Sequence, residues 1–109
     1  MQEKNTYPRP SLFWRVAIIP DGARYAIPGK THVSLPGGVS IFQPVNLAPR
    51  TRCKLIFEVP SRDYKNRSFE EIEATVVNVS LVGHRGEFRT SFKFCRDNAD
   101  LLNLLNRRN

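Results

Sequence analysis

Hydrophobic and polar residues alternate with a period of two in several short stretches of the chain. The clearest stretch is 52–59, where apolar residues occupy the odd-numbered positions and, apart from Ile56, charged residues occupy the even-numbered ones. The stretch 87–94 repeats the pattern, with three phenylalanines and one threonine at its even-numbered positions. A period of two is typical of strands with one buried face, so both stretches are predicted to be β-strands.

Five further stretches have the composition of strands, because apolar and β-branched residues run between turn residues. They are 14–20, 23–27, 30–35, 38–42 and 69–81. Turns are expected at the Pro-Asp-Gly of 20–22, the Pro-Gly of 28–29, the Pro-Gly-Gly of 36–38 and the polar loop 61–68. Six or seven short strands with close turns predict an all-β fold, a small antiparallel β-barrel.

The pattern changes near residue 98. Leucines at 101, 102, 104 and 105 have helical spacing, so a C-terminal α-helix is expected over 98–108. Such a short helix is marginal alone, and its leucines are expected to dock on an opening of the barrel. Residues 1–12 contain two prolines and few apolar residues and are expected to form a flexible leader. This leaves 13–109 as a single domain.

The chain of 109 residues has a formal net charge of +7, and 12 of its 17 basic residues are arginine. Arginine binds phosphate through a planar pair of donors and stacks on flat rings. An anionic partner such as a nucleotide, a nucleic acid or a phospholipid is therefore one explanation. The arginines are spread along the chain, so a solvated basic surface is the other explanation.

Membrane insertion, metal binding and catalysis have no supporting pattern. No apolar run approaches the roughly 20 residues of a membrane-spanning helix, and the first residues lack a signal peptide's apolar segment, so a cytoplasmic protein is expected. Cys53 and Cys95 lie in strand-like stretches and are expected to be reduced thiols. With two histidines and no paired carboxylates or activated nucleophile, no cofactor, metal site or catalytic residue is predicted.

Two phrases of six residues are nearly alike. His32-Val-Ser-Leu-Pro-Gly37 and Asn78-Val-Ser-Leu-Val-Gly83 share their central Val-Ser-Leu and the final glycine, while the flanking sequences share nothing. The first phrase ends in a turn between two expected strands. The second lies within residues 74–94, which are expected to be the last hairpin.

With these elements the chain resembles the PilZ domain family, from about Arg9 to the C-terminal helix. Members of this family are six-stranded antiparallel barrels with a C-terminal helix, and many are receptors for the bacterial second messenger cyclic di-GMP. The family has two binding signatures. One is Arg-x-x-x-Arg just before the first strand, and the other is Asp/Asn-x-Ser-x-x-Gly in a turn farther along the chain.

The later phrase matches the second signature letter for letter, but it is not expected to be the ligand turn. Only 26 residues follow Gly83. This leaves room for one strand and one helix, whereas the family has several strands after its motif. Asn78 and Ser80 are therefore expected to be ordinary strand residues.

The resemblance assigns the ligand turn to the earlier phrase, with His32, Ser34 and Gly37 at the motif positions and Gly38 beside them. Guanine presents donors on its N1 and N2 edge, which a carboxylate or amide oxygen accepts well, whereas neutral histidine offers one acceptor nitrogen. The Ser34 hydroxyl and the glycine backbone still suit a base edge or a phosphate. The alternative is a Pro-Gly-Gly segment that only makes a tight turn.

The arginine signature is incomplete. Arg15 occupies the place of the second arginine, but Ser11 stands four positions earlier. Arg9 would substitute for the missing arginine only if the leader folds differently. A single arginine keeps part of the pairing with phosphates and the stacking on guanine. Phe13 and Trp14 are either core residues that start the first strand or an exposed aromatic patch.

The first function considered is a non-enzymatic receptor that binds cyclic di-GMP through the arginine segment and the 32–38 turn, in signalling that controls motility and biofilm. The second is a degenerate PilZ domain that binds no nucleotide and acts as a protein–protein interaction module in pilus or motility machinery. Both functions imply a downstream protein partner. A nucleic-acid-binding barrel is disfavoured, because the phenylalanines of 87–94 lie opposite its cations.

Overall fold

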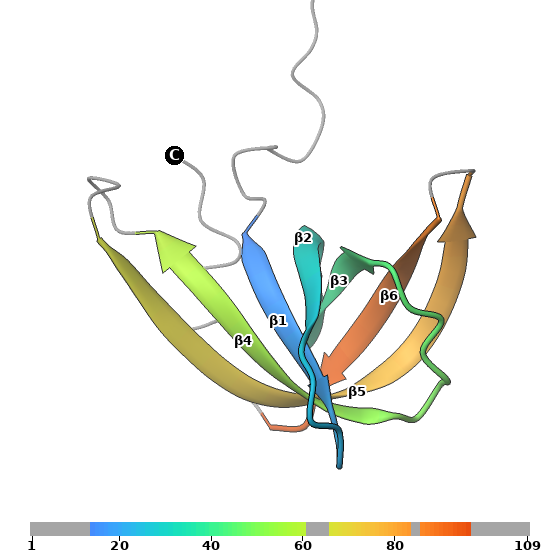
Figure 1. The fold of residues 1–109 in the computed structure, drawn as a ribbon, viewed down its shortest axis with the longest axis horizontal. Coiled ribbons are helices and arrows are strands. Elements are labelled where there is room, and N and C mark those ends of the chain that lie inside the picture. The colour runs from blue at the N-terminus through green and yellow to red at the C-terminus, as the bar shows by residue number, and fades with distance from the viewer. Residues whose placement is uncertain (1–13, 61–65, 84–85, 97–109) are drawn as a thin grey trace, which may run out of the picture.

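The computed structural model describes residues 14–60, 66–83 and 86–96. It contains six strands (Figure 1): β1 (Arg15–Pro20), β2 (Ile27–Leu35), β3 (Gly38–Gln43), β4 (Arg52–Pro60), β5 (Arg67–Val82) and β6 (Glu87–Phe94). The predicted leader 1–12, with Arg9, and the predicted helix 98–108 lie outside the described residues. None of the residues in the described ranges forms a helix that is long and apolar enough to span a membrane.

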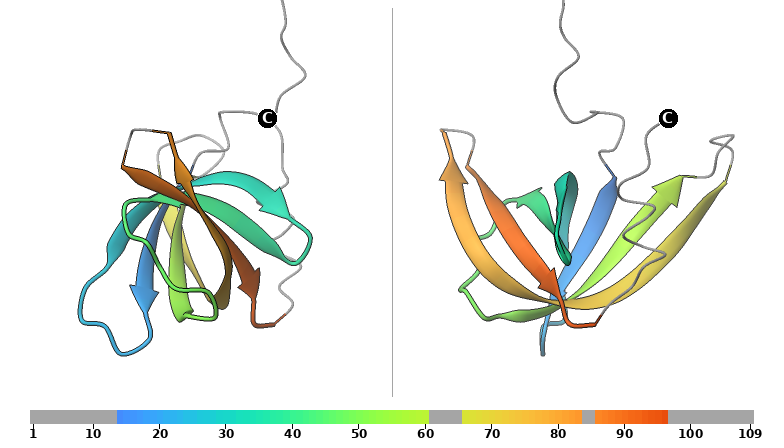
Figure 2. Two further views of the ribbon diagram at one scale, coloured as in Figure 1. Left: turned by 90° about the vertical axis from the view of Figure 1, so that its right-hand side faces the viewer. Right: turned by 180° about the vertical axis from the view of Figure 1, so that it is seen from behind.

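The six strands close into an antiparallel barrel in the order β1-β2-β3-β6-β5-β4. Two pairings between distant strands close it, because β1 pairs with β4 and β3 pairs with β6. The left panel of Figure 2 shows β2, β3 and β6 side by side on one wall of the barrel. The small antiparallel β-barrel predicted from the strand pattern is therefore confirmed, and so is the number of six strands that the family resemblance implied.

Alternating residues of each strand fill the barrel. In β4 the four apolar residues at odd positions are buried, and β6 buries Thr90, Phe92 and Phe94 while its alternate residues face outward. β5 contributes Ile72, Ala74 and Val76 to the same core. Removal of this apolar surface from water is the main term that stabilises the fold.

Trp14 is held at the end of the core next to β1. Its ring is buried and meets Phe57 edge to face, with ring centroids 6.4 Å apart. Its backbone N–H donates to Thr31 Oγ1 at 2.8 Å, and its carbonyl accepts from the Thr31 N–H at 2.9 Å. The interpretation of Trp14 as a core residue is confirmed, while Phe13 lies outside the described residues.

The first hairpin differs from the expected one. Residues 21–26 form its loop, so the strand predicted over 23–27 and the turn predicted at 28–29 are both wrong. Ile18 pairs with Ile27 and Ala17 with Pro28, so the second strand begins at Ile27. This register buries Ile27 and leaves Tyr25 exposed in the loop, because burial of the isoleucine decides which residues pair.

Strands β3 and β6 approach each other very closely at Gly38. A Cβ added to this residue would lie 1.9 Å from the Phe92 carbonyl oxygen, a distance that no side chain tolerates. The neighbouring Gly37 has open space around it but a positive φ of 70°, which suits the tight turn between β2 and β3. Gly37 also accepts a hydrogen bond from the Phe94 N–H at 2.8 Å. Packing therefore explains the glycine at position 38, and turn geometry explains the glycine at position 37.

We predict that Gly38→Ala lowers the free energy of unfolding by about 3 kcal/mol, because β3 must move away from β6. The control Gly37→Ala should cost only about 1 kcal/mol, the penalty of a left-handed conformation. Urea denaturation followed by circular dichroism measures both values. Equal losses in the two variants would contradict the packing explanation.

Candidate functional site

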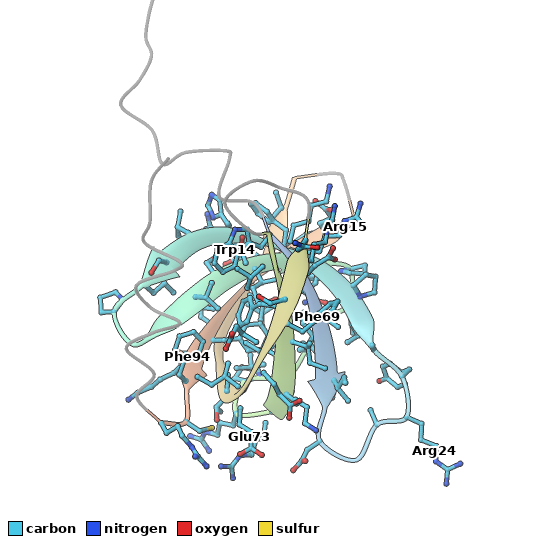
Figure 3. The ribbon with its side chains drawn as sticks, turned by 90° about the vertical axis from the view of Figure 1, so that its left-hand side faces the viewer. Trp14, Arg15, Arg24, Phe69, Glu73 and Phe94 are labelled. Atoms are coloured by element: carbon cyan, nitrogen blue, oxygen red, sulfur yellow. The ribbon has the colours of Figure 1, made fainter. Side chains whose placement is uncertain are left out.

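A row of outward-facing residues crosses five strands of the barrel in continuous register. Arg15 pairs with Lys30, Lys30 with Phe42, Phe42 with Arg89, and Arg89 with Ser80. Directly opposed residues in a sheet lie on the same face, so these five side chains form one band, here called the outer row. Figure 3 shows Arg15 at the opposite end of the barrel from Arg24.

Two rings contact each other in the middle of this band. A β-bulge lies between Thr31 and Val33, and the ring of His32 at this bulge lies 4.5 Å from that of Phe42, centroid to centroid. The interplanar angle is 39°. The ring pair places flat apolar surface between the cations of the outer row, at Arg15 and Lys30 on one side and Arg89 on the other.

A depression lies beside each of the two rings. One has a volume of about 350 Å³ and is lined by Arg15, Lys30 and Phe42, together with the carboxylate of Glu87. The other, here called the serine depression, has a volume of about 270 Å³. It is lined by residues of four adjacent strands: His32, Val33, Leu35, Ser40, Asn78, Ser80, Arg89 and Ser91.

Two buried polar atoms in the serine depression have no hydrogen-bond partner among the described residues. They are Ser40 Oγ and His32 Nδ1. Ser40 is only 3% exposed, although its side chain lies on the outer face of β3, between the inward-facing Val39 and Ile41. A buried hydroxyl without a hydrogen bond costs free energy unless a water or a ligand atom supplies the bond.

The pKa of His32 lies below its ordinary value of 6.5. Burial is the main cause, and the positive charge of Arg89 lowers the pKa further. His32 is therefore neutral at pH 7 and leaves the positive charge of this face to Arg89, Lys30 and Arg15. A neutral imidazole also has one nitrogen free to accept a hydrogen bond.

Four of the six acidic residues in the described ranges lie on the opposite wall, and three of these four are paired with cations. Arg52 pairs with Glu73 at 3.5 Å and Lys54 with Glu71 at 3.3 Å, all on β4 and β5. A third pair joins Arg67 to Glu58 on the same wall. By contrast, the three cations of the outer row form no ion pair within the described ranges. Arg15, Lys30 and Arg89 therefore place positive charge without a paired carboxylate on the β1-β2-β3-β6 wall.

The predicted site residues are brought together only in part. Arg15 and His32 both lie on the outer wall, and Gly37 is exposed in the turn. Ser34 pairs with the core residue Val39, so its side chain is on the inner-facing side of β2, away from the outer row. Gly38 is buried against β6 and has a packing role.

Sequence reasoning missed the contribution of the last hairpin to this face. Residues 74–94 do form the β5–β6 hairpin, and Asn78 and Ser80 are strand residues, as predicted. Their side chains nevertheless line the same depression as His32, so the two similar phrases adjoin in space. The pairing of β3 with β6 produces this proximity, and no local pattern in the sequence indicates it.

In comparisons with known proteins, no family model, no curated protein and no solved structure matches this chain. Across the described residues, no three His, Cys, Asp or Glu side chains are placed to hold a metal ion. The outer wall offers the chemistry of its cations, rings, hydroxyls and amide. Such groups bind phosphates and heterocyclic bases.

We predict that acidification destabilises the protein partly through His32. Because the pKa of His32 is lower in the folded state, the unfolded chain binds more protons below about pH 6.5. The free energy of unfolding therefore decreases as the pH is lowered through that range. In His32→Phe, which keeps a ring against Phe42, the decrease between pH 7.5 and pH 5 should be smaller. Urea denaturation at each pH gives the two slopes, and identical slopes would contradict this effect.

We also predict that Ser40→Ala raises the free energy of unfolding by about 1 kcal/mol, because it removes a buried hydroxyl that lacks a hydrogen bond. The matched control is Thr90→Val, since Thr90 Oγ1 accepts a hydrogen bond from Gln43 Nε2 at 2.8 Å. That variant should lose about 1 kcal/mol. Thermal unfolding distinguishes the opposite signs, and a clear loss in Ser40→Ala would show that its hydroxyl is satisfied.

Proposed function

We propose that this protein is a PilZ-type receptor for cyclic di-GMP, with no enzymatic activity, that binds the dinucleotide on its outer row. The observation that carries the proposal is the order of side chains in that row: Arg15 and Lys30, then the Phe42–His32 ring pair, then Arg89. Cyclic di-GMP carries two phosphates and two guanine bases on one ring. Its recognition needs cations and flat surfaces close together.

The cations suit the phosphates. Arginine grips a phosphate through two parallel hydrogen bonds, and lysine contributes a mobile point charge. This chain lacks the first arginine of the family signature. Arg15 and Lys30 are direct neighbours at one end of the row, so Lys30 supplies the second cation. Since these cations are not paired with carboxylates in the described structure, a dianion is attracted to this wall.

The sizes of the depressions also suit a molecule with two bases. Ligand pockets for whole drug-sized molecules have volumes of about 300–1,000 Å³. The depressions of about 350 and 270 Å³ are therefore each suited to one part of the dinucleotide, with the ring pair between them. Stacking of a base on an aromatic ring contributes about 1–3 kcal/mol.

Two departures from the family pattern imply weaker binding than in receptors with intact signatures. His32 replaces the acid or amide, and the arginine pair is incomplete. Each lost charged hydrogen bond costs about 1.5–3 kcal/mol, or roughly one to two decades in Kd. Binding in the micromolar range is therefore the expected result.

Isothermal titration of the full chain with cyclic di-GMP tests the proposal. Arg15→Ala and Lys30→Ala should each weaken binding about tenfold. Glu87→Gln, which removes the carboxylate beside both cations, should strengthen it about threefold. The matched control is Arg52→Ala, because Arg52 pairs with Glu73 on the opposite wall, and its Kd should not change. Absence of heat at high micromolar protein would overturn the proposal.

A second candidate function is an interaction module that binds no nucleotide. It is favoured by Phe69, whose side chain is 68% exposed. Phe69 lines a depression of about 410 Å³ together with Ile56 and Ala17, next to Arg15 (Figure 3). This candidate requires that wild type gives no heat with cyclic di-GMP, and that Phe69→Ser loses a protein partner which Arg15→Ala retains.

A further inference from the structure

Ile56 interrupts the charged outer face of β4. The outward positions on either side of it hold Lys54 and Glu58, so Ile56 is the exception to the alternation of this strand. Ala17 of β1 pairs directly with Ile56, and Pro28 of β2 pairs directly with Ala17. The three apolar residues therefore adjoin on the outer face of three strands. Scattered exposed apolar residues are ordinary on a protein surface, whereas contiguous ones mark an interaction site.

Phe69 extends this group onto β5. It pairs with Glu58, the next outward residue of β4 after Ile56, and it is 68% exposed. Phe69, Ile56, Ala17 and Pro28 line one depression of about 410 Å³ (Figure 3). These four residues are here called the apolar patch. Covering an exposed phenyl ring with a partner removes a large apolar area from water, so the patch favours association.

Opposite charges border the apolar patch. Arg15 of β1 and Glu58 of β4 line the same depression. The pairing of Val16 with Phe57 places Arg15 and Glu58 beside each other on the outer face. Lys30 adds a second cation next to Arg15, on the side away from Glu58. A surface whose two halves carry opposite charges is complementary to a second copy of itself.

We propose that the apolar patch is the interface of a symmetric homodimer. A two-fold axis between the copies, parallel to β1 and β4, lays β1 of each copy on β4 of the other. Residues at the same height along the strands then meet, so Ala17 of one copy contacts Ile56 of the other. In the same way, Arg15 of one copy contacts Glu58 of the other. Because such an interface is isologous, each contact is made twice.

Phe69 contributes farther from the axis. In the same arrangement β5 of one copy lies on β2 of the other, and Phe69 meets Lys30, the residue at its height. A lysine above a phenyl ring makes a favourable cation–π contact. Packed sheets cross at an angle of about 30°, so the contacts nearest the axis keep their register most closely. The contact of Arg15 with Glu58 is among these, and an exchange of charges tests it.

Sedimentation equilibrium of the full chain tests the dimer. Wild type should show a reversible monomer–dimer equilibrium between low and high micromolar protein. Phe69→Ser should raise the Kd of the dimer at least about tenfold, as expected for truncation of an aromatic interface residue. The matched control is Leu81→Ser, because Leu81 is 63% exposed on the half of β5 that pairs with β6, and its Kd should equal that of wild type.

An exchange of charges tests the arrangement of the two copies. In Arg15→Glu two carboxylates face each other at each contact, and in Glu58→Arg two guanidinium groups do, so each variant alone should dimerise at least about tenfold more weakly. In an equimolar mixture of the two variants, opposite charges face each other at both contacts. The mixture should therefore form a heterodimer with an affinity close to that of wild type. Far-UV circular dichroism shows whether each variant is folded.

The outcomes decide this inference separately from the receptor function. No nucleotide is added, because Arg15 also lines the depression of about 350 Å³ assigned to the dinucleotide. Wild type that stays monomeric at high micromolar protein overturns the dimer. A dimer that Phe69→Ser leaves unchanged, or that Leu81→Ser weakens equally, overturns the interface. Folded charge variants that form no heterodimer overturn the two-fold arrangement.

Glu58 also pairs with Arg67 in its own chain, so Glu58→Arg carries a risk to folding. If that variant does not fold, the comparison of Phe69→Ser with Leu81→Ser decides the proposal. Selective loss of the dimer in Phe69→Ser supports it, and any other result overturns it.

Discussion

The pairing of β3 with β6 is the constraint on which the rest of the structure depends. It joins the β2–β3 hairpin to the β5–β6 hairpin, and with the β1–β4 pairing it closes the barrel. Gly38 allows it, because a Cβ there would collide with the Phe92 carbonyl oxygen. A glycine that sequence reasoning attributed to ligand binding therefore determines where the wall of the candidate site can form.

Closure of the barrel also separates the charges. Three carboxylates of β4 and β5 pair with arginine and lysine side chains on their own wall. Arg15, Lys30 and Arg89 on β1, β2 and β6 lie near the rings of His32 and Phe42. One carboxylate, that of Glu87, lines the same depression as Arg15 and Lys30. Arg15, Lys30 and Arg89, which are distant from one another in the sequence, thus lie together on one wall of the structure. This distribution supports an anionic ligand more specifically than the net charge does.

Local patterns were sufficient to predict most of the fold. Alternation predicted β4 and β6 closely, and turn residues predicted the β2–β3 hairpin, because a half-buried strand has a period of two. The errors at 23–29 arose where the register of β1 against β2 overrode the turn propensity of a Pro-Gly pair. Such a register depends on which isoleucine becomes buried, and composition does not determine that.

The candidate site was less predictable than the fold. Arg15 and His32 were found by resemblance to a family, but Ser34 lies on the inner-facing side of β2 because of the bulge at His32. Ser40 and Asn78 looked like ordinary strand residues, since each is a polar position in an alternating stretch. Their proximity follows from two pairings between strands and from a second bulge, between Val76 and Asn78. Long-range pairings of this kind have no local signal.

The most direct test of the proposed ligand-binding wall is the change in backbone amide chemical shifts when cyclic di-GMP is added to the isotope-labelled full chain. The account predicts saturable shifts that are largest along Lys30, Phe42, Ser91 and Arg89, on adjacent strands of one wall. Residues of the neutralised wall, such as Lys54 and Glu71, should not move. Shifts centred on β4 and β5, or no shift at saturating dinucleotide, would contradict it.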